Sequence, residues 1–335
     1  MNIKKIAKVS LFSALTLLVT GCSPSADSSH SFTFDIANST VNHNLSSGSG
    51  MVVNNGKIMV VGDDSPWLFS VNNDFKINKK TLIEHFSVNE QNRINYKIKP
   101  DFESMTMVNY LNKPYYLVMG SGSKAVLREQ AYLMPVNGGE NQKLSLSNLY
   151  AQLHKVANFT QQEKINIEGI ASTGNEIFIF NRGNEGKNAI FTMDKNELMS
   201  YLEGKTQALP SLKVYQVQLP KINGVQACFS GADYWKDADS MLFTASVEGN
   251  NNSSISDGAI QGSFVGVLPL KALANKSSID LTGYNTKELK NNGKAIITKA
   301  ESIAIETQTN KKASGYIVSD NDNGTSQFFT FTIDK

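Results

Sequence analysis

The 335-residue sequence is poor in several residue types, and each shortage excludes a class of protein. Two cysteines cannot support a disulfide-rich scaffold or a cysteine-based zinc cluster. Four histidines show no H-E-x-x-H or similar close spacing, which argues against a zinc hydrolase. Charged residues amount to only 19% with a net charge of +2, so the concentrated basic surface of a non-specific nucleic-acid binder is missing.

Several catalytic and cofactor-binding signatures are missing as well. The tetrapeptide at 120–123, Gly-Ser-Gly-Ser, lacks the spacing of a G-x-S-x-G nucleophile elbow. P-loop and Rossmann fingerprints are absent. The chain is instead rich in Asn, Ser, Thr and Gly, whereas a long helical protein would carry more Glu, Lys, Ala and Leu. This balance indicates a β-rich, exported protein.

The first 22 residues have the organisation of an export signal. Three lysines lie among the first eight residues, an apolar run covers 6–19, and the segment ends in Leu18-Val19-Thr20-Gly21-Cys22. The apolar run is shorter than the roughly 20 residues of a bilayer-spanning helix, which favours a cleaved signal. The ending resembles the bacterial lipobox, which implies acylation of Cys22 and, because Ser23 follows, sorting to the outer membrane.

A plain cleaved signal with an incidental cysteine is the alternative for this segment. Lipid chains on Cys22 would hold the protein at the membrane by burying CH₂ groups. We predict a lipoprotein signal peptide at 1–21, a flexible lipidated tether at 22–30 and a folded body at 31–335.

A repeat runs through the body of the chain. Five segments each open with a polar residue, continue with a small one and pass into a short strand-like run. They follow one another at intervals of about 54 to 71 residues. Each is followed by a second apolar run that ends in a polar turn. The five opening residues are Ser49, Glu103, Glu168, Ser230 and Glu301.

Repeats of this length, built from short β-branched and aromatic runs between Gly, Asn and Asp turns, are typical of β-propeller blades. We predict an all-β propeller with five blades. The alternatives are six blades, with one between 258 and 299, and a pair of β-sandwiches. Because a ring must remove its open sheet edges, the strand-like segment 31–36 is predicted to pair with 328–333 in the last blade. Apolar residues three and four apart predict helical insertions at 146–156 and 195–202.

The motifs of the repeats also carry a resemblance. They are Pro100-Asp101-Phe102-Glu103, Ile167-Glu168-Gly169-Ile170-Ala171, Ala300-Glu301-Ser302-Ile303-Ala304, Gly62-Asp63-Asp64-Ser65-Pro66-Trp67, Gly120-Ser121-Gly122-Ser123 with Arg128, and Ser319-Asp320-Asn321-Asp322. With them the body resembles the phytase-like and esterase-like β-propellers of bacteria. The resemblance implies acidic residues that bind calcium at one mouth of the ring and hydrolyse phosphate esters. The chain departs from that pattern because Ser49 and Ser230 stand at two opening positions and a dense Lys and Arg set is missing.

Equivalent positions of a propeller converge on its axis, so the three opening glutamates are predicted to meet there. Packed carboxylates raise one another's pKa, and calcium or an arginine relieves their repulsion. Three interpretations stay open: hydrogen bonds that hold neighbouring blades, a cation site, or direct catalysis. The catalytic candidates are Glu103, Glu168 and Glu301, and the candidate metal ligands are Glu103, Glu168, Glu301, Asp320 and Asp322.

The polar turns after the second runs are predicted to line the mouth. These ligand-binding candidates are Asp63, Asp64, Ser121, Arg128, Arg182, Asn184, Glu248 and Asp257. The polar stretch 250–256 is predicted to be a loop over the mouth. The segment 320–324 has the alternating oxygen ligands of an EF-hand loop but no Glu at the required distance, which favours a polar β-turn.

These observations favour an outer-membrane-anchored propeller that binds a ligand or protein partner at its polar mouth without turnover. A calcium-dependent hydrolase of phosphate or carboxylic esters is one alternative, in which the cation polarises the ester and activates water. A scaffold in envelope assembly is the other. Calcium is the only cofactor that we expect. The expected partners are membrane lipid and a ligand or envelope protein, with no nucleic acid, and we expect a monomer.

Overall fold

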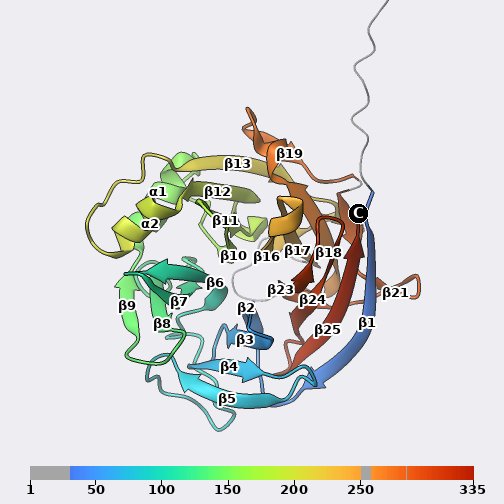
Figure 1. Cartoon of the computed structure of the whole chain (residues 1–335), viewed down its shortest axis with the longest axis horizontal. Coiled ribbons are helices and arrows are strands. Elements are labelled where there is room, and N and C mark those ends of the chain that lie inside the picture. The colour runs from blue at the N-terminus through green and yellow to red at the C-terminus, as the bar shows by residue number, and fades with distance from the viewer. Residues whose placement is uncertain (1–30, 250–257, 284) are drawn as a thin grey trace, which may run out of the picture.

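Five twisted sheets surround a common axis in the computed structural model, which describes residues 31–249, 258–283 and 285–335 (Figure 1). In each sheet the chain begins at an innermost strand and moves outward through antiparallel neighbours. The innermost strands of adjacent sheets contact one another around the axis. The predicted five-bladed β-propeller is therefore confirmed.

The blades follow one another in chain order. Blade 1 contains β2 (Gly48–Asn54), β3 (Lys57–Gly62), β4 (Trp67–Val71) and β5 (Ile77–Leu82). Blade 2 contains β6 (Phe102–Tyr110), β7 (Lys113–Gly120), β8 (Gln130–Pro135) and β9 (Gln142–Ser145). Blade 3 contains β10 (Ile167–Ser172), β11 (Glu176–Asn181), β12 (Ala189–Asp194), β13 (Lys213–Gln218) and β19 (Ser278–Asp280).

The last two blades complete the ring. Blade 4 contains β16 (Cys228–Trp235), β17 (Ser240–Glu248), β18 (Ile260–Pro269) and β20 (Thr286–Glu288). Blade 5 contains β23 (Lys299–Gln308), β24 (Lys312–Asp320), β25 (Ser326–Asp334) and β1 (Thr33–Asn42). Two small hairpins join blades, β14 (Lys221–Ile222) with β15 (Val225–Gln226) and β21 (Lys290–Asn291) with β22 (Lys294–Ala295). Short 3₁₀ turns are η1 (Gly183–Glu185), η2 (Lys236–Ala238) and η3 (Leu270–Leu273).

The ring closes where its two ends meet. The blue β1 lies beside the red β25 in Figure 1, and Phe34 pairs with Ile333 in an antiparallel register. The rings of Phe34 and Phe331 stack with their centroids 5.3 Å apart. The predicted closure of the last blade by an N-terminal strand is thus observed.

The described part of the segment 258–299 forms no sixth blade. It supplies β18 and β20 to blade 4, and between them it sends β19 across to blade 3. There β19 runs parallel to β13, with Gln216 opposite Ser278 and Gln218 opposite Asp280. Through this pairing, the segment between β18 and β20 connects the outer edges of blades 3 and 4.

Apolar side chains fill the space between each pair of adjacent blades. Five clusters of buried residues lie at the five interfaces. Between blades 3 and 4, Phe229 packs edge-on against Phe180 and Phe243, with ring centroids 5.2 and 5.3 Å apart. The stability of the ring therefore comes from blade-to-blade burial, because each blade covers the faces of its neighbours.

Local sequence explains the turns and the two helices. Asn55 and Gly56 both have positive φ between β2 and β3, as a tight hairpin requires. The helices α1 (Ser147–Val156) and α2 (Lys195–Leu202) lie on the outer side of blade 3, close to the predicted ranges (Figure 1). The Asp194 side chain caps α2 by accepting from the backbone N–H groups of Asn196 and Glu197. Among the described residues, no helix is long and apolar enough to cross a bilayer.

Candidate functional site

The five opening residues of the repeats occupy the same place in the five blades. At each one the pairing of the innermost strand with its neighbour shifts by a β-bulge. A bulge leaves a residue outside the ladder and turns its side chain in a new direction. A small residue follows, and a Cβ added to Gly231 would lie 2.6 Å from the carbonyl oxygen of Glu301. The innermost strands therefore approach too closely for a larger side chain there.

Charged side chains gather at the end of the axis where the innermost strands begin. We call them the axial cluster. Its nine carboxyl groups belong to Asp63, Asp64, Asp101, Glu103, Glu168, Glu248, Glu301, Asp320 and Asp322, and its five basic groups to Arg93, Lys99, Arg128, Arg182 and Lys299. If all were ionised, the axial cluster would carry four negative charges in excess.

Asp101 organises the part of the axial cluster near blade 2. Its Oδ2 accepts from the Ser121 hydroxyl at 2.5 Å and from Nη1 of Arg128 at 2.7 Å. Its Oδ1 lies 2.7 Å from Nζ of Lys99, which also pairs with Asp63. Burial alone would raise the pKa of Asp101, but Lys99 and Arg128 hold it below its usual value. Asp101 therefore stays an anion.

Arg182 and Lys299 bridge the carboxylates of blades 3, 4 and 5. Arg182 donates to Oε1 of Glu248, and its Nη1 lies 3.5 Å from Oε1 of Glu168. Lys299 Nζ lies 3.1 Å from Oε1 of Glu301 and 3.7 Å from Oε1 of Glu248. All five side chains are at least nine-tenths buried. The axial cluster thus contains ion pairs largely shielded from water.

Glu103 differs from the other two opening glutamates. Among the described residues it has no hydrogen bond and no ion pair, although it lies deep in the ring with partial access to solvent. Burial raises its pKa well above the usual value, and Glu168, Asp101 and Asp63 raise it further. One oxygen each of Asp63, Asp101 and Glu103 lies within 4.8 Å of the others. Oδ1 of Asp63 and Oε2 of Glu301 are buried and have no hydrogen-bond partner in the part of the chain that the structure describes.

Three further carboxyl groups of the axial cluster hold protons unusually tightly. Burial raises the pKa of Glu168 to about 8, against the opposing effect of Arg182. Burial also raises the pKa of Asp320 to about 7 and that of Asp64 to about 6, with neighbouring Asp63 contributing to both. Protonation and the basic side chains together neutralise much of the excess charge.

These raised pKa values predict that the protein becomes less stable from pH 6 to pH 8. The folded state binds protons that the unfolded state has released, so the stabilisation is complete below the ordinary carboxyl pKa and is lost as pH rises through the raised values. We expect the free energy of unfolding to fall by about 4 kcal/mol over this window, with Glu168 contributing the larger share. Urea unfolding at constant ionic strength measures it. The substitution Glu168→Gln should flatten the profile, and stability that rises with pH would contradict the assignment.

The structure places most of the predicted mouth residues in the axial cluster, but some serve other contacts. Ser121 is buried and holds Asp101. Asn184 accepts from Nδ2 of Asn166 at 3.2 Å. Ser230 donates to the carbonyl of Ala300 at 2.5 Å, which links blades 4 and 5. The backbone N–H of Asp322 donates to Oδ1 of Asp320 at 2.9 Å, as in a polar turn. Cys22, the loop 250–256 and Asp257 lie outside the described residues.

Sequence reasoning missed four members of the axial cluster, namely Arg93, Lys99, Asp101 and Lys299. Asp101 and Lys299 each stand two residues before an opening glutamate. In blade 3 the equivalent position is Asn166, whose Nδ2 donates to Glu168 at 2.9 Å. Alternate residues of a strand face the same side. The polar residues two positions before the opening glutamates could therefore have been predicted to lie at the same site. Lys99 and Arg93 lie in the connection between blades 1 and 2, outside the strands that carry the repeat.

The fold and the axial cluster define a five-bladed β-propeller with a charged site on its axis. The chain belongs to the family described as "Family of unknown function (DUF6929)", whose model matches residues 44–333. No curated protein matches the sequence.

Solved structures with a similar chain path have little sequence in common with this chain. Glutaminyl cyclase of Myxococcus xanthus is 8% identical over 90% of this chain and 96% of its own, with a TM-score of 0.42. A thermostable family-43 glycoside hydrolase is 11% identical over 88% and 90%, with a TM-score of 0.45. The endo-arabinanase of Bacillus licheniformis is 13% identical over 89% and 96%, with a TM-score of 0.41. Likeness at this level carries no information about the ligand or reaction of this chain.

Proposed function

We propose that the protein is a lipid-anchored propeller of the outer membrane that binds, without turnover, a ligand carrying positive charge at its axial cluster. The observation that carries this proposal is Glu103, a deeply placed carboxyl group without a hydrogen-bond or ion-pair partner among the described residues. The anchor rests on the lipobox-like ending at Cys22.

Charge balance supports a positively charged ligand. The axial cluster has four more carboxyl groups than basic groups, and it keeps them close together only by protonating some of them. A bound cation would replace those protons and pair with the carboxylates directly. Two kinds of ligand could supply this positive charge, a hard metal ion or an organic ammonium group.

A metal ion would find oxygen ligands beside Lys99. Within residues 31–249, 258–283 and 285–335, Glu103 has no hydrogen bond or ion pair and the buried Oδ1 of Asp63 has no hydrogen-bond partner. Calcium accepts such carboxylate ligands and completes its shell with backbone carbonyls or water. The ammonium group of Lys99 already pairs with Asp63 and Asp101. The positive charge of Lys99 neutralises part of the negative charge of Asp63 and Asp101. Glu103 is therefore the metal ligand on which the proposal depends.

The experiment is a melting-temperature series with calcium chloride, with chelator and with ethylamine. A ligand that binds only the folded state raises stability by about 2.7 kcal/mol at 100 times its Kd, or a few degrees for a chain of this size. We expect a shift with calcium or with ethylamine, and the active one identifies the source. Glu103→Gln should abolish the shift, and Glu90→Gln, at an exposed site, should leave it unchanged. A chain that responds to neither cation refutes the proposal.

A calcium-dependent ester hydrolase is the second candidate, favoured by the three carboxyl oxygens that lie within 4.8 Å of one another. In this candidate the cation would polarise the ester and activate water. The calcium-loaded protein is therefore also offered p-nitrophenyl phosphate and p-nitrophenyl acetate. If hydrolysis needs calcium and disappears in Glu103→Gln, the protein is a hydrolase and the proposal of binding without turnover is wrong.

A further inference from the structure

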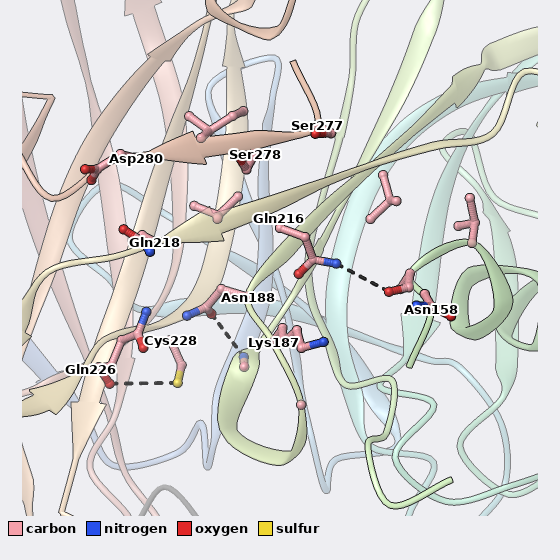
Figure 2. A pocket seen from close by; sticks show the side chains of 17 residues that line it. Asn158, Lys187, Asn188, Gln216, Gln218, Gln226, Cys228, Ser277, Ser278 and Asp280 are labelled. Carbon is pink, nitrogen blue, oxygen red and sulfur yellow. Dashed lines mark hydrogen bonds between the residues drawn. The ribbon is translucent and has the colours of Figure 1, made fainter. Parts of the chain in front are cut away.

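A cavity opens beside the outer strands of blade 3, next to the part of the axial cluster that contains Arg182. Its volume is about 770 Å³, and its walls come from the end of α1, the loop between β11 and β12, β13, the start of β16 and β19 (Figure 2). Five of its lining side chains are carboxamides. They are Asn158, Asn188, Gln216, Gln218 and Gln226. We call it the amide cleft.

We propose that the amide cleft binds a neutral saccharide. A carboxamide has two donor hydrogens and an acceptor oxygen, and each sugar hydroxyl can both donate and accept. Asn188 already uses its oxygen and one N–H in contacts within the protein, so the other lining carboxamides carry the recognition. Aliphatic side chains in the same lining, such as Val156 and Val214, match the C–H faces of a sugar ring. A pocket with an apolar part and a few placed polar groups is the usual form of a small-molecule site.

Gln216 is the residue that most directly requires a ligand. Its Nε2 donates weakly to the carbonyl of Ala157 at 3.4 Å, but its Oε1 is buried and accepts no hydrogen bond from any described residue. An unsatisfied buried acceptor costs free energy that a donor would recover. Figure 2 shows Gln216 and Gln218 on β13 beside Ser278 on β19. A ligand hydroxyl placed there would donate to Oε1 of Gln216 after the side chain rotates toward the cleft and gives up its weak bond to Ala157.

The charged groups of the lining are already engaged. Nζ of Lys187 lies 3.5 Å from Oε1 of Glu163, and Oδ1 of Asp280 accepts from the Thr282 hydroxyl at 2.6 Å. The thiol of Cys228 stays neutral, because burial raises its pKa. The lining therefore favours an uncharged ligand over an ion.

The backbone of the cleft floor argues against a peptide that adds as a strand. The N–H of Gln216 donates to Ser277, the N–H of Val217 donates to Asn188, and the carbonyl of Gln218 accepts from Leu281, each at 2.9 Å. Strand addition needs free backbone groups at an edge, and β13 lies between β12 and β19, so this floor offers side chains instead. Recognition there must use carboxamides and hydroxyls.

One wall of the cleft is held rigid before any ligand binds. Oδ1 of Asn188 accepts from the backbone N–H groups of Gly183 and Phe229 at 3.0 and 3.1 Å, and its Nδ2 donates to Ala227 at 2.9 Å. These contacts tie the loop between β11 and β12 to the start of β16. Such preorganisation lowers the ordering cost of binding.

The test is isothermal titration calorimetry of the full chain with maltotriose, xylotriose and triacetylchitotriose, and with N-acetyl-trialanine amide as the peptide probe. We expect one of the saccharides to bind and the peptide not to. Gln216→Met keeps the size of the side chain but removes its hydrogen bonds, and Gln218→Ala removes a side chain at an exposed position. Each should weaken saccharide binding about tenfold, which corresponds to about 1.4 kcal/mol.

Gln162→Met is the matched control, because Gln162 is exposed and does not line the cleft. Glu103→Gln should bind the saccharide as the native chain does, which separates this site from the axial cluster. The proposal is overturned if no saccharide binds, if the peptide binds in its place, or if Gln216→Met and Gln218→Ala bind the saccharide normally.

Discussion

Replacing Arg182 with methionine is expected to lower the free energy of unfolding by about 3–5 kcal/mol. Arg182 lies between Glu168 and Glu248, and all three side chains are at least nine-tenths buried. Methionine keeps most of the volume but removes the charge, so Glu248 loses the guanidinium to which it is hydrogen-bonded. A buried carboxylate left without its partner costs far more than an exposed one, because water cannot replace the lost contact.

Two further variants test this explanation. Lys143→Met breaks an ion pair with Glu84 in which the lysine side chain is 45% exposed, and such surface pairs contribute at most about 1 kcal/mol. The double variant Arg182→Met, Glu248→Gln also removes the unpaired carboxylate of Glu248, so it should recover part of the lost free energy of unfolding. Urea unfolding measures all three chains. A loss below about 1 kcal/mol for Arg182→Met would show that water reaches the axial cluster freely.

A chain that begins at residue 43 is expected to show no cooperative thermal transition. This truncation removes β1, which pairs with β25 along its whole length, and with it the buried Phe32 and Ile36. The loss of Phe32 alone should cost about 3–5 kcal/mol, as for other fully buried aromatic residues. The exposed edge of β25 would then present unpaired backbone groups, which promote association between chains.

The control for this truncation is a chain that begins at residue 31. It keeps β1 but lacks Cys22, so we expect it to leave the membrane fraction and still melt like the full chain. Calorimetry and membrane fractionation measure the two effects separately. A chain beginning at 43 that melts normally would mean that blade 5 does not need its outermost strand.

Much of the ring was visible in the sequence because its signals are local and repeat. The five opening residues carry the same polar-small pattern, and the structure finds a β-bulge at each of them. The closing strand was predicted because the segments 31–36 and 328–333 both alternate apolar and polar residues, as a half-buried strand does. A parallel crossing such as β19 left no such signal, since three residues are too few to show a period.

The sequence by itself determined that this chain is a ring of about five β-rich repeats, and that three glutamates share one position in those repeats. Only the tertiary structure decided which of them are paired. Arg182 reaches Glu168 and Lys299 reaches Glu301. Lys99 pairs with Asp63 and Asp101 instead, so Glu103 has no ion pair with any residue that the structure describes. Periodicity follows from backbone geometry and is local. Ion pairing depends on the distances between charged side chains that come from five separate blades and meet at the axis. Those distances are not encoded in any single repeat.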